Sequence, residues 1–275
     1  MEFSKLVKKV LVSSLGALTI LNYSPKQVSA NERAFDFTLA NGVLQSLVAG
    51  VGGYRNGCGF LKSAIKGFVG GSLEGMAKSC VGDDISCAWP AKLMNALGAS
   101  IVNDTANCDS LGTSFAVDYG PVFLEWKNDR KDKFNWYILP DSLGVELALI
   151  GNGHKFSLED SVKYGIPIFY SKDEMNNVNA VTLTNNILID KSSERENTKK
   201  HESIHTFQYF DSYPLGNLIL NFNDKSNKIK TNIEESHFKI EPLLGFIPLV
   251  STYLFYNPNT FTNIPLEQEA YGLTE

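Results

Sequence analysis

Residues 201–205 read HESIH, which places two histidines around a glutamate in the order H-E-x-x-H. Four positions apart on a helix, His201 and His205 would point the same way, one turn above the other. Both imidazoles could then bind one Zn²⁺ ion at about 2.1 Å, while Glu202 faces a water in the open coordination position. Zinc acidifies such a water, and a carboxylate that is not a ligand can take its proton during attack on a carbonyl. The spacing therefore predicts a hydrolytic zinc site with Glu202 as general base.

The alternative interpretation is an ordinary polar helix that carries two histidines. The chain has only 4 histidines, so this arrangement rarely arises by chance. Its position in a helix that follows strands, in a chain with an export signal, favours the metal site. His154 and His237 lack ligand-like spacing to other residues, and we expect them to have structural roles.

A catalytic zinc site needs three protein ligands. Asp211 lies six positions after His205, where the metzincin pattern H-E-x-x-H-x-x-G-x-x-H has its third ligand or an aspartate variant of it. However, Gln208 replaces the glycine of that pattern, and no methionine follows Met175 to form the required turn. Glu234-Glu235 is a second candidate, in a polar stretch that favours a loop or a helix start.

The third candidate carries a family resemblance. Glu267-Gln268-Glu269-Ala270-Tyr271 resembles the second helix of the gluzincins, which contains E-x-x-A-D or E-x-E-A. The resemblance implies that Glu267 is the third zinc ligand, with Glu269 as the alternative, and that Ala270 packs closely. Tyr271 would support the site, although it stands where the family has an aspartate that orients an imidazole.

The longer string H-E-x-x-H-x-x-Q, from His201 to Gln208, resembles a group of bacterial metallopeptidases. In these proteins a strand-rich segment precedes the helix and an E-x-E-A helix follows it. The resemblance covers mainly residues 145–275 and implies a minimal zincin-type helical core, with no defined substrate. Gln208, one turn beyond His205, would either hydrogen-bond the site or cap the helix.

The elements that must position this helix indicate an α+β fold. A cap at Ser192-Ser193 would start the helix, which should end near Asp211, before Pro214. Upstream, strands are expected at residues 115–126 and 133–140, which form a hairpin, and at 166–171 and 180–190, with a short helix at 157–165. The last strand segment should fold at Asn185-Asn186. A small antiparallel sheet is thus predicted directly before the metal-binding helix.

Residues 40–100 hold twelve of the 22 glycines, and this Gly-rich part is similar to that of uncharacterised bacterial envelope proteins. Gly67, Gly71 and Gly75 recur at every fourth position, which on a helix makes a smooth ridge for close packing. Charged residues interrupt the candidate membrane spans, at Lys62, Lys66, Glu74 and Lys78. We expect a soluble helical hairpin, and peripheral membrane contact through this region stays open.

Residues 1–30 have the pattern of a secretory signal peptide. Three lysines precede the apolar run at 10–21, and Val28-Ser29-Ala30 offers small residues for cleavage. An uncleaved anchoring segment is the alternative. In an exported protein the four cysteines predict two disulfides with three possible connectivities, and free buried thiols are the alternative. The cysteines are Cys58, Cys80, Cys87 and Cys108.

Loss of residues 1–30 would remove four lysines and one glutamate, leaving 21 basic and 29 acidic residues and a net charge of −8. Such a chain, without a basic stripe, is a poor candidate for binding nucleic acid. The predicted organisation is a signal peptide (1–30), a Gly-rich, Cys-containing helical region (31–112), and a sheet with a zincin-like metal-binding region (113–275).

These features predict an exported, zinc-dependent metallohydrolase of the periplasm, cell envelope or extracellular space. A metallopeptidase acting on a peptide or protein substrate is favoured. The alternative is a non-enzymatic envelope or membrane-associated protein with a structural or degenerate zinc site. A third possibility is an inactive zincin fold kept as a binding module, for which Tyr271 is the one hint.

Overall fold

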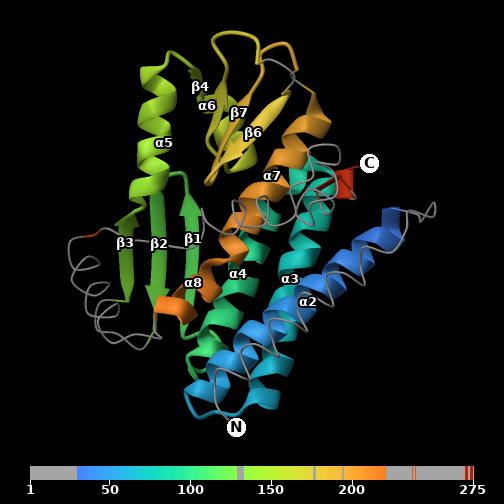
Figure 1. Cartoon of the computed structure of the whole chain (residues 1–275), viewed down its shortest axis with the longest axis vertical. Helices are drawn as coiled ribbons and strands as arrows, with labels where there is room; N and C mark the ends of the chain where they lie inside the picture. Colours follow the sequence, from blue (N-terminus) through green and yellow to red (C-terminus); the bar gives the residue numbers. More distant parts are fainter. Residues whose placement is uncertain are drawn as a thin grey trace.

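The computed structural model describes residues 30–128, 133–175, 178–193 and 195–220, together with residues 237, 239, 270–271 and 273–274. Figure 1 shows how its helices and strands are arranged. Several sequence predictions lie outside the described residues. These are the signal peptide, the ligand candidates Glu234, Glu235, Glu267 and Glu269, and the start of the last helix.

The Gly-rich region folds as three helices and not as the expected hairpin. They are α2 (Ala30–Arg55), α3 (Phe60–Asp83) and α4 (Ala88–Ala106), with the short 3₁₀ helix η1 (Ile85–Cys87) between α3 and α4. Gly57 and Gly59 both have φ +89°, a conformation that suits glycine and ends α2. Asp84 then caps η1 by accepting from the Ser86 backbone N–H. These two local breaks divide the region into three helices.

The predicted glycine ridge is confirmed. A Cβ on Gly67 would lie 2.4 Å from the Ala49 Cβ, and one on Gly71 would lie 2.4 Å from the Asn41 carbonyl oxygen. Both neighbours belong to α2, so the ridge lets the α2 and α3 backbones approach closely. Gly70 does the same towards α4, because its Cβ would lie 2.7 Å from the Gly98 carbonyl oxygen.

Two disulfides form, as predicted, and the connectivity is now assigned. Cys58–Cys108 joins the start of α3 to the end of α4. Cys80–Cys87 joins the end of α3 to η1. The two bridges therefore lie at opposite ends of the α3–α4 pair.

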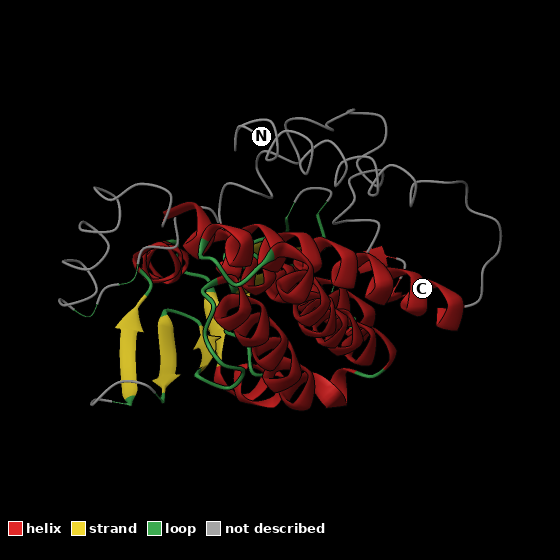
Figure 2. Ribbon diagram, turned by 90° about the horizontal axis from the view of Figure 1, so that it is seen from below, coloured by secondary structure: helices red, strands yellow, loops and turns green. Residues whose placement is uncertain are grey.

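The first sheet has three antiparallel strands in the order β1-β2-β3, namely β1 (Ser114–Tyr119), β2 (Val122–Lys127) and β3 (Phe134–Ile138). The sequence predicted two strands here. The first of them is divided at Gly120-Pro121, where Gly120 has φ +52° and proline lacks a backbone N–H for the ladder. Helix α5 (Pro140–Gly151) follows. Figure 2 shows this sheet at one side of the helices.

The predicted small antiparallel sheet is the three-stranded one, and the strands expected at 166–171 and 180–190 lie in a second, mixed sheet. Its order is β4-β5-β7-β6, with β4 (Lys155–Ser157), β5 (Ile168–Tyr170), β6 (Ala180–Leu183) and β7 (Asn186–Ile189). The chain turns at Thr184-Asn185, one position earlier than expected, and Thr184 has φ +58°. β7 then pairs parallel to β5. The predicted helix between β4 and β5 is α6 (Leu158–Tyr164), capped by Ser157 as expected.

The H-E-x-x-H segment lies in α7 (Glu196–Asp211), which ends where predicted but starts later than Ser192-Ser193. Ser192 donates its hydroxyl to Asp190 Oδ1 at 2.5 Å, so it stabilises a turn after β7 instead of capping the helix. Pro214 does not stop the helical path, because it lies in the first turn of α8 (Tyr213–Leu220), where proline is tolerated.

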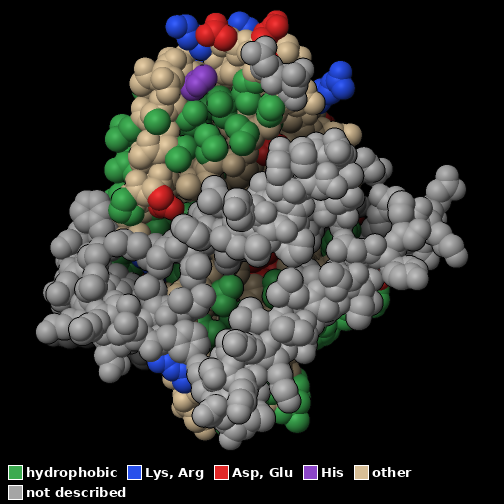
Figure 3. All heavy atoms as spheres, in the orientation of Figure 1, with side chains coloured by type: hydrophobic (Ala, Val, Ile, Leu, Met, Phe, Trp, Pro, Cys, Tyr) green, Lys and Arg blue, Asp and Glu red, His purple; other side chains and the backbone are tan. Residues whose placement is uncertain are grey.

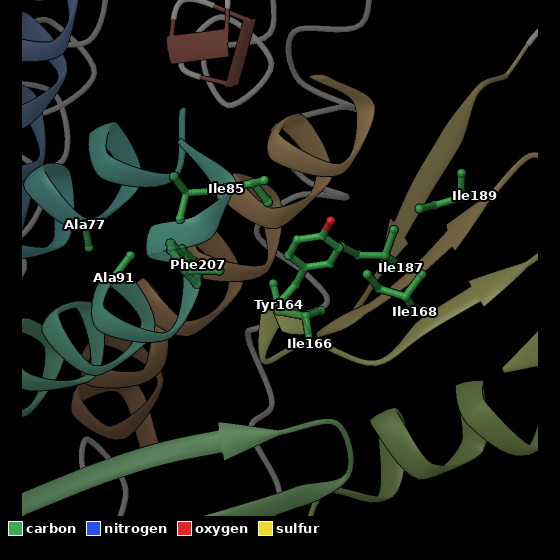
Figure 4. Packing of buried hydrophobic residues seen from close by; sticks show 11 residues of the cluster. Ala77, Ile85, Ala91, Tyr164, Ile166, Ile168, Ile187, Ile189 and Phe207 are labelled. Carbon is green, nitrogen blue, oxygen red and sulfur yellow. The ribbon is translucent and has the colours of Figure 1, made fainter. Parts of the chain in front are cut away.

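Several clusters of buried hydrophobic side chains join these elements. The largest in the described part of the chain combines side chains of α3, η1, α4, α6, the four-stranded sheet and α7, and Figure 4 labels nine of its members: Ala77, Ile85, Ala91, Tyr164, Ile166, Ile168, Ile187, Ile189 and Phe207. The fold is α+β, as predicted, with the Gly-rich helices packed against the helix that carries the histidines.

Candidate metal centre

The two histidines of α7 point at each other. His201 Nε2 and His205 Nε2 are 3.1 Å apart, and the rings are nearly perpendicular, at 82°. Two nitrogens bound to one tetrahedral zinc, each at about 2.1 Å, lie about 3.4 Å apart. The separation in the structure is close to that value. The donor pair therefore fits a zinc ion with small adjustments of the side chains.

Gln208 fixes the ring of His205. Its Oε1 lies 2.7 Å from His205 Nδ1. A carbonyl oxygen only accepts hydrogen bonds, so Nδ1 carries the proton and Nε2 keeps its lone pair. This is the tautomer that a metal-binding imidazole needs, and a partner on the far nitrogen is what orients such a ligand.

Glu202 is buried, with 7% of its surface exposed, and is held by the four-stranded sheet. Thr182 on β6 donates to Glu202 Oε2 at 2.7 Å and to the Glu202 carbonyl oxygen at 3.0 Å. The carboxylate therefore has a fixed position between α7 and β6. Sequence analysis did not single out Thr182, because its strand position carries no signal for a contact with α7.

The Tyr271 ring packs against the ring of His201. The centroids of its ring and of the His201 ring are 4.3 Å apart. Its neighbour Ala270 is fully buried and packs in one cluster with Ile204 and Leu273. The segment that resembles the second gluzincin helix thus packs on α7 at Ala270 and Tyr271. Within the described residues, no three His, Cys, Asp or Glu side chains are grouped closely enough to hold a metal.

Other polar residues near the end of α7 have partners elsewhere. Asp211 forms an ion pair with Lys78 of α3 at 2.7 Å, which gives it a structural role in place of the metzincin-like one. Tyr209 donates to Asp141 Oδ2 at 2.6 Å, and Tyr213 donates to Glu125 Oε1 at 3.2 Å.

The two remaining histidines contact the protein far from α7. His154 Nδ1 accepts from the Lys172 backbone N–H at 3.2 Å. His237 stacks on Trp136 with ring centroids 4.7 Å apart. Such contacts are typical of side chains with a structural role.

A buried ion pair lies beside the three-stranded sheet. Lys239 Nζ is 3.5 Å from Glu125 Oε1 and 3.6 Å from the Phe123 ring centroid. Burial alone would raise the pKa of Glu125, but Lys239 and Lys127, with hydrogen bonds from Lys127 and Tyr213, lower it to about 2. This ion pair holds residue 239 against β2, and no sequence pattern indicates it.

Comparison with known proteins assigns the chain to no family. No protein-family model, no curated protein and no solved structure matches the chain. A function must therefore be inferred from α7 and its contacts.

Proposed function

We propose that the protein is an exported zinc-dependent metallohydrolase that acts as a metallopeptidase. His201 and His205 would hold the zinc ion through their Nε2 atoms, and Glu202 would be the general base. The observation that carries this proposal is the 3.1 Å separation of the two Nε2 atoms, with His205 oriented by Gln208. The two disulfides fit an oxidising compartment and so support export.

Glu267 is proposed as the third ligand, with Glu269 as the alternative. The contact between Tyr271 and His201 supports a ligand from this segment. Glu267 precedes Tyr271 by four positions, and four residues span at most about 14 Å even when fully extended. This short spacing along the chain is compatible with a ligand role for Glu267.

If held by His201 and His205, zinc would act as a Lewis acid that lowers the pKa of water at the site. The protein supplies the rest. Thr182 holds Glu202 Oε2, which leaves Oε1 to accept the proton. Gln208 keeps the His205 ring in place while charge develops at the site.

The neighbouring strand favours a peptide as the substrate. β6 is an edge strand: in the part of the chain that the structure describes, it pairs with β7 and with no other strand. An extended peptide can add to such an edge through backbone hydrogen bonds. Because Thr182 belongs to β6 and contacts Glu202, a peptide added there would run next to the proposed base.

The test is the zinc content of the exported chain, residues 31–275, measured by elemental mass spectrometry. We expect about one zinc per chain, lost in His205→Ala and kept in His154→Ala, which removes a histidine far from α7. Without metal, one neutral imidazole donating to the other gives the same Nε2 separation. Absence of stoichiometric zinc from the unmodified protein would assign the contact to that hydrogen bond and overturn the proposal.

A second candidate is a non-enzymatic envelope protein with a structural or degenerate zinc site. The Tyr271 ring on His201, at a position where gluzincins have aspartate, favours a degenerate site, as in an inactive zincin fold kept as a binding module. X-ray absorption spectroscopy of the zinc-loaded protein separates the two candidates. Three protein ligands and a water indicate a catalytic site, and four protein ligands indicate a structural one.

A further inference from the structure

The outward surfaces of α3 and α4 are apolar. The exposed residues of α3 are Leu61, Lys62, Ile65, Phe68, Val69, Met76 and Asp83, and those of α4 are Trp89, Pro90, Leu93 and Leu97. The two charged members, Lys62 and Asp83, lie at the ends of α3. Between them Lys66 is half-buried, and the other charged residues of the two helices are buried. A helix on the surface of a water-soluble protein normally has polar residues on this side.

The inward surfaces of the same helices are polar or small. On α3 the buried residues include Glu74, Lys78 and several glycines, and on α4 they include Lys92, Asn95 and Asp104. Charged side chains are almost never fully buried unless they are paired. Glu74, Lys78, Lys92 and Asp104 thus face inwards among small apolar residues, while most of the larger apolar side chains of the two helices face outwards.

The buried charges have partners. Lys78 pairs with Asp211 of α7 at 2.7 Å, and Lys92 pairs with Asp118 of β1 at 3.2 Å. Glu74 Oε2 accepts from Gln45 Nε2 of α2 at 2.8 Å. These contacts fix which way each helix faces, because they turn the polar side of α3 towards α7 and that of α4 towards β1.

The exposed side chains of the two helices share one surface. Leu61, Ile65 and Val69 recur every four residues on α3, and Leu93 and Leu97 do so on α4, so each set lies on one side of its helix. The helices touch at Gly70 and Gly98. The exposed side chains lie on the sides of the helices opposite to those that face α7 and β1. We call these five residues, with Met76, the apolar face.

We propose that the apolar face inserts into the hydrocarbon of one leaflet of a membrane, with α3 and α4 lying along its surface. Apolar side chains outside, paired charges inside and small residues between helices are the pattern of helices packed in lipid. α2 adds to this pattern, since residues 34–55 are long and apolar enough to cross a membrane by length and composition. The inference is independent of zinc binding by α7.

The disulfides argue that α3 and α4 lie along the membrane and do not span it. α3 has 24 residues, and at about 1.5 Å per residue its ends are about 35 Å apart. Cys58–Cys108 closes one end of the α3–α4 pair and Cys80–Cys87 closes the other. A spanning orientation would put one of them in a reducing compartment, where disulfides rarely persist.

The lack of charge on the apolar face identifies the lipid chemistry. Because Lys62, Lys66 and Asp83 are the only charges of α3 and α4 that reach the surface, and their signs partly cancel, anionic headgroups should contribute little to binding. We expect the protein to bind vesicles of zwitterionic phosphatidylcholine, with an affinity that changes little between low and high salt.

The experiment is flotation of the full exported chain with phosphatidylcholine vesicles. Val69→Glu and Leu97→Glu each place a charge in the apolar face, and each should weaken binding about tenfold or more.

Leu147→Glu is the matched control. Leu147 is 60% exposed on α5, and Figure 3 shows hydrophobic side chains gathered over α5 and the four-stranded sheet. This second apolar area lies outside the α3–α4 pair, and the control should bind within about twofold of the unmodified protein. Thermal unfolding verifies that each variant is folded.

Three results would overturn the proposal. The first is failure of the unmodified protein to float, and the second is flotation of both apolar-face variants equal to that of the unmodified protein. The third is a dimer, detected by light scattering, that Leu97→Glu abolishes although no variant binds vesicles. That result would assign the apolar face to a second copy of the chain.

Discussion

The Thr182 hydroxyl donates to Glu202 Oε2 at 2.7 Å, which ties an edge strand to the helix that carries both histidines. The same hydroxyl donates to the Glu202 carbonyl oxygen at 3.0 Å. A single side chain thus fixes both the backbone and the carboxylate of the proposed base. The position of Glu202 is set by the sheet as well as by the helix.

Loss of this hydroxyl should impair hydrolysis without loss of metal. In Thr182→Val the shape is kept but the donor is removed, and we expect kcat on labelled casein to fall about 10–100-fold, as for partners that orient groups at metal sites. Thr182→Ser keeps the donor and should stay within about threefold. Zinc content should match in both variants. An unchanged kcat in Thr182→Val would show that Glu202 needs no support from β6.

Glu202→Gln should separate metal binding from catalysis. The amide keeps the size of the side chain but cannot take a proton, so hydrolysis should fall by about a thousandfold or more, while zinc remains bound to the two histidines. Glu159→Gln, on the exposed surface of α6, is the control and should keep full activity. Full activity in Glu202→Gln would exclude Glu202 as the general base.

Substitution of glycine by alanine should have opposite effects at two helical sites, Gly71 in the glycine ridge and Gly144 on α5. In Gly71→Ala the new Cβ would lie 2.4 Å from the Asn41 carbonyl oxygen, and separating α2 from α3 should lower the free energy of unfolding by about 1–3 kcal/mol. In Gly144→Ala no atom lies within 4 Å of the new Cβ. The better helix propensity of alanine should therefore raise the free energy of unfolding by up to about 1 kcal/mol. Urea unfolding measures both. Equal effects at the two sites would contradict close packing at Gly71.

Acid should remove the contribution of Glu125 to stability. Its pKa is lowered from 4.5 to about 2 in the folded protein, so it binds protons more weakly there than in the unfolded chain. Its stabilising effect is complete above about pH 5 and is lost as the pH falls towards 2. The gap in unfolding free energy between the unmodified protein and Glu125→Gln should therefore narrow from pH 5 to pH 2. A constant gap would mean that the carboxylate is not stabilised by Lys239.

Local patterns in the sequence predicted much of this structure. The α7 histidines, the glycine ridge and the Ser157 cap all depend on residues within a few positions of one another, where helical geometry is enough. The α+β class followed from the change of composition along the chain. Both disulfides were expected from the cysteine count and the export signal, but their connectivity was not.

Features that depend on distant pairing could not be predicted. The parallel pairing of β5 with β7 is decided by how the β6–β7 hairpin packs, so the sequence pattern did not indicate the second, mixed sheet. The contact of Thr182 with Glu202 and the ion pair of Glu125 with Lys239 join separate segments in the same way. The first strand segment was assigned as one strand because its apolar pattern outweighed the Gly120-Pro121 break.

The contact between His201 and Tyr271 also sets an order of events during synthesis. Translation reaches Tyr271 about 70 residues after His201, which at about 5–20 residues per second takes several seconds. Throughout that interval residues 196–211 have been synthesised without the segment that packs on α7. The surroundings of His201 are therefore assembled late, after the Gly-rich helices and both sheets have been synthesised.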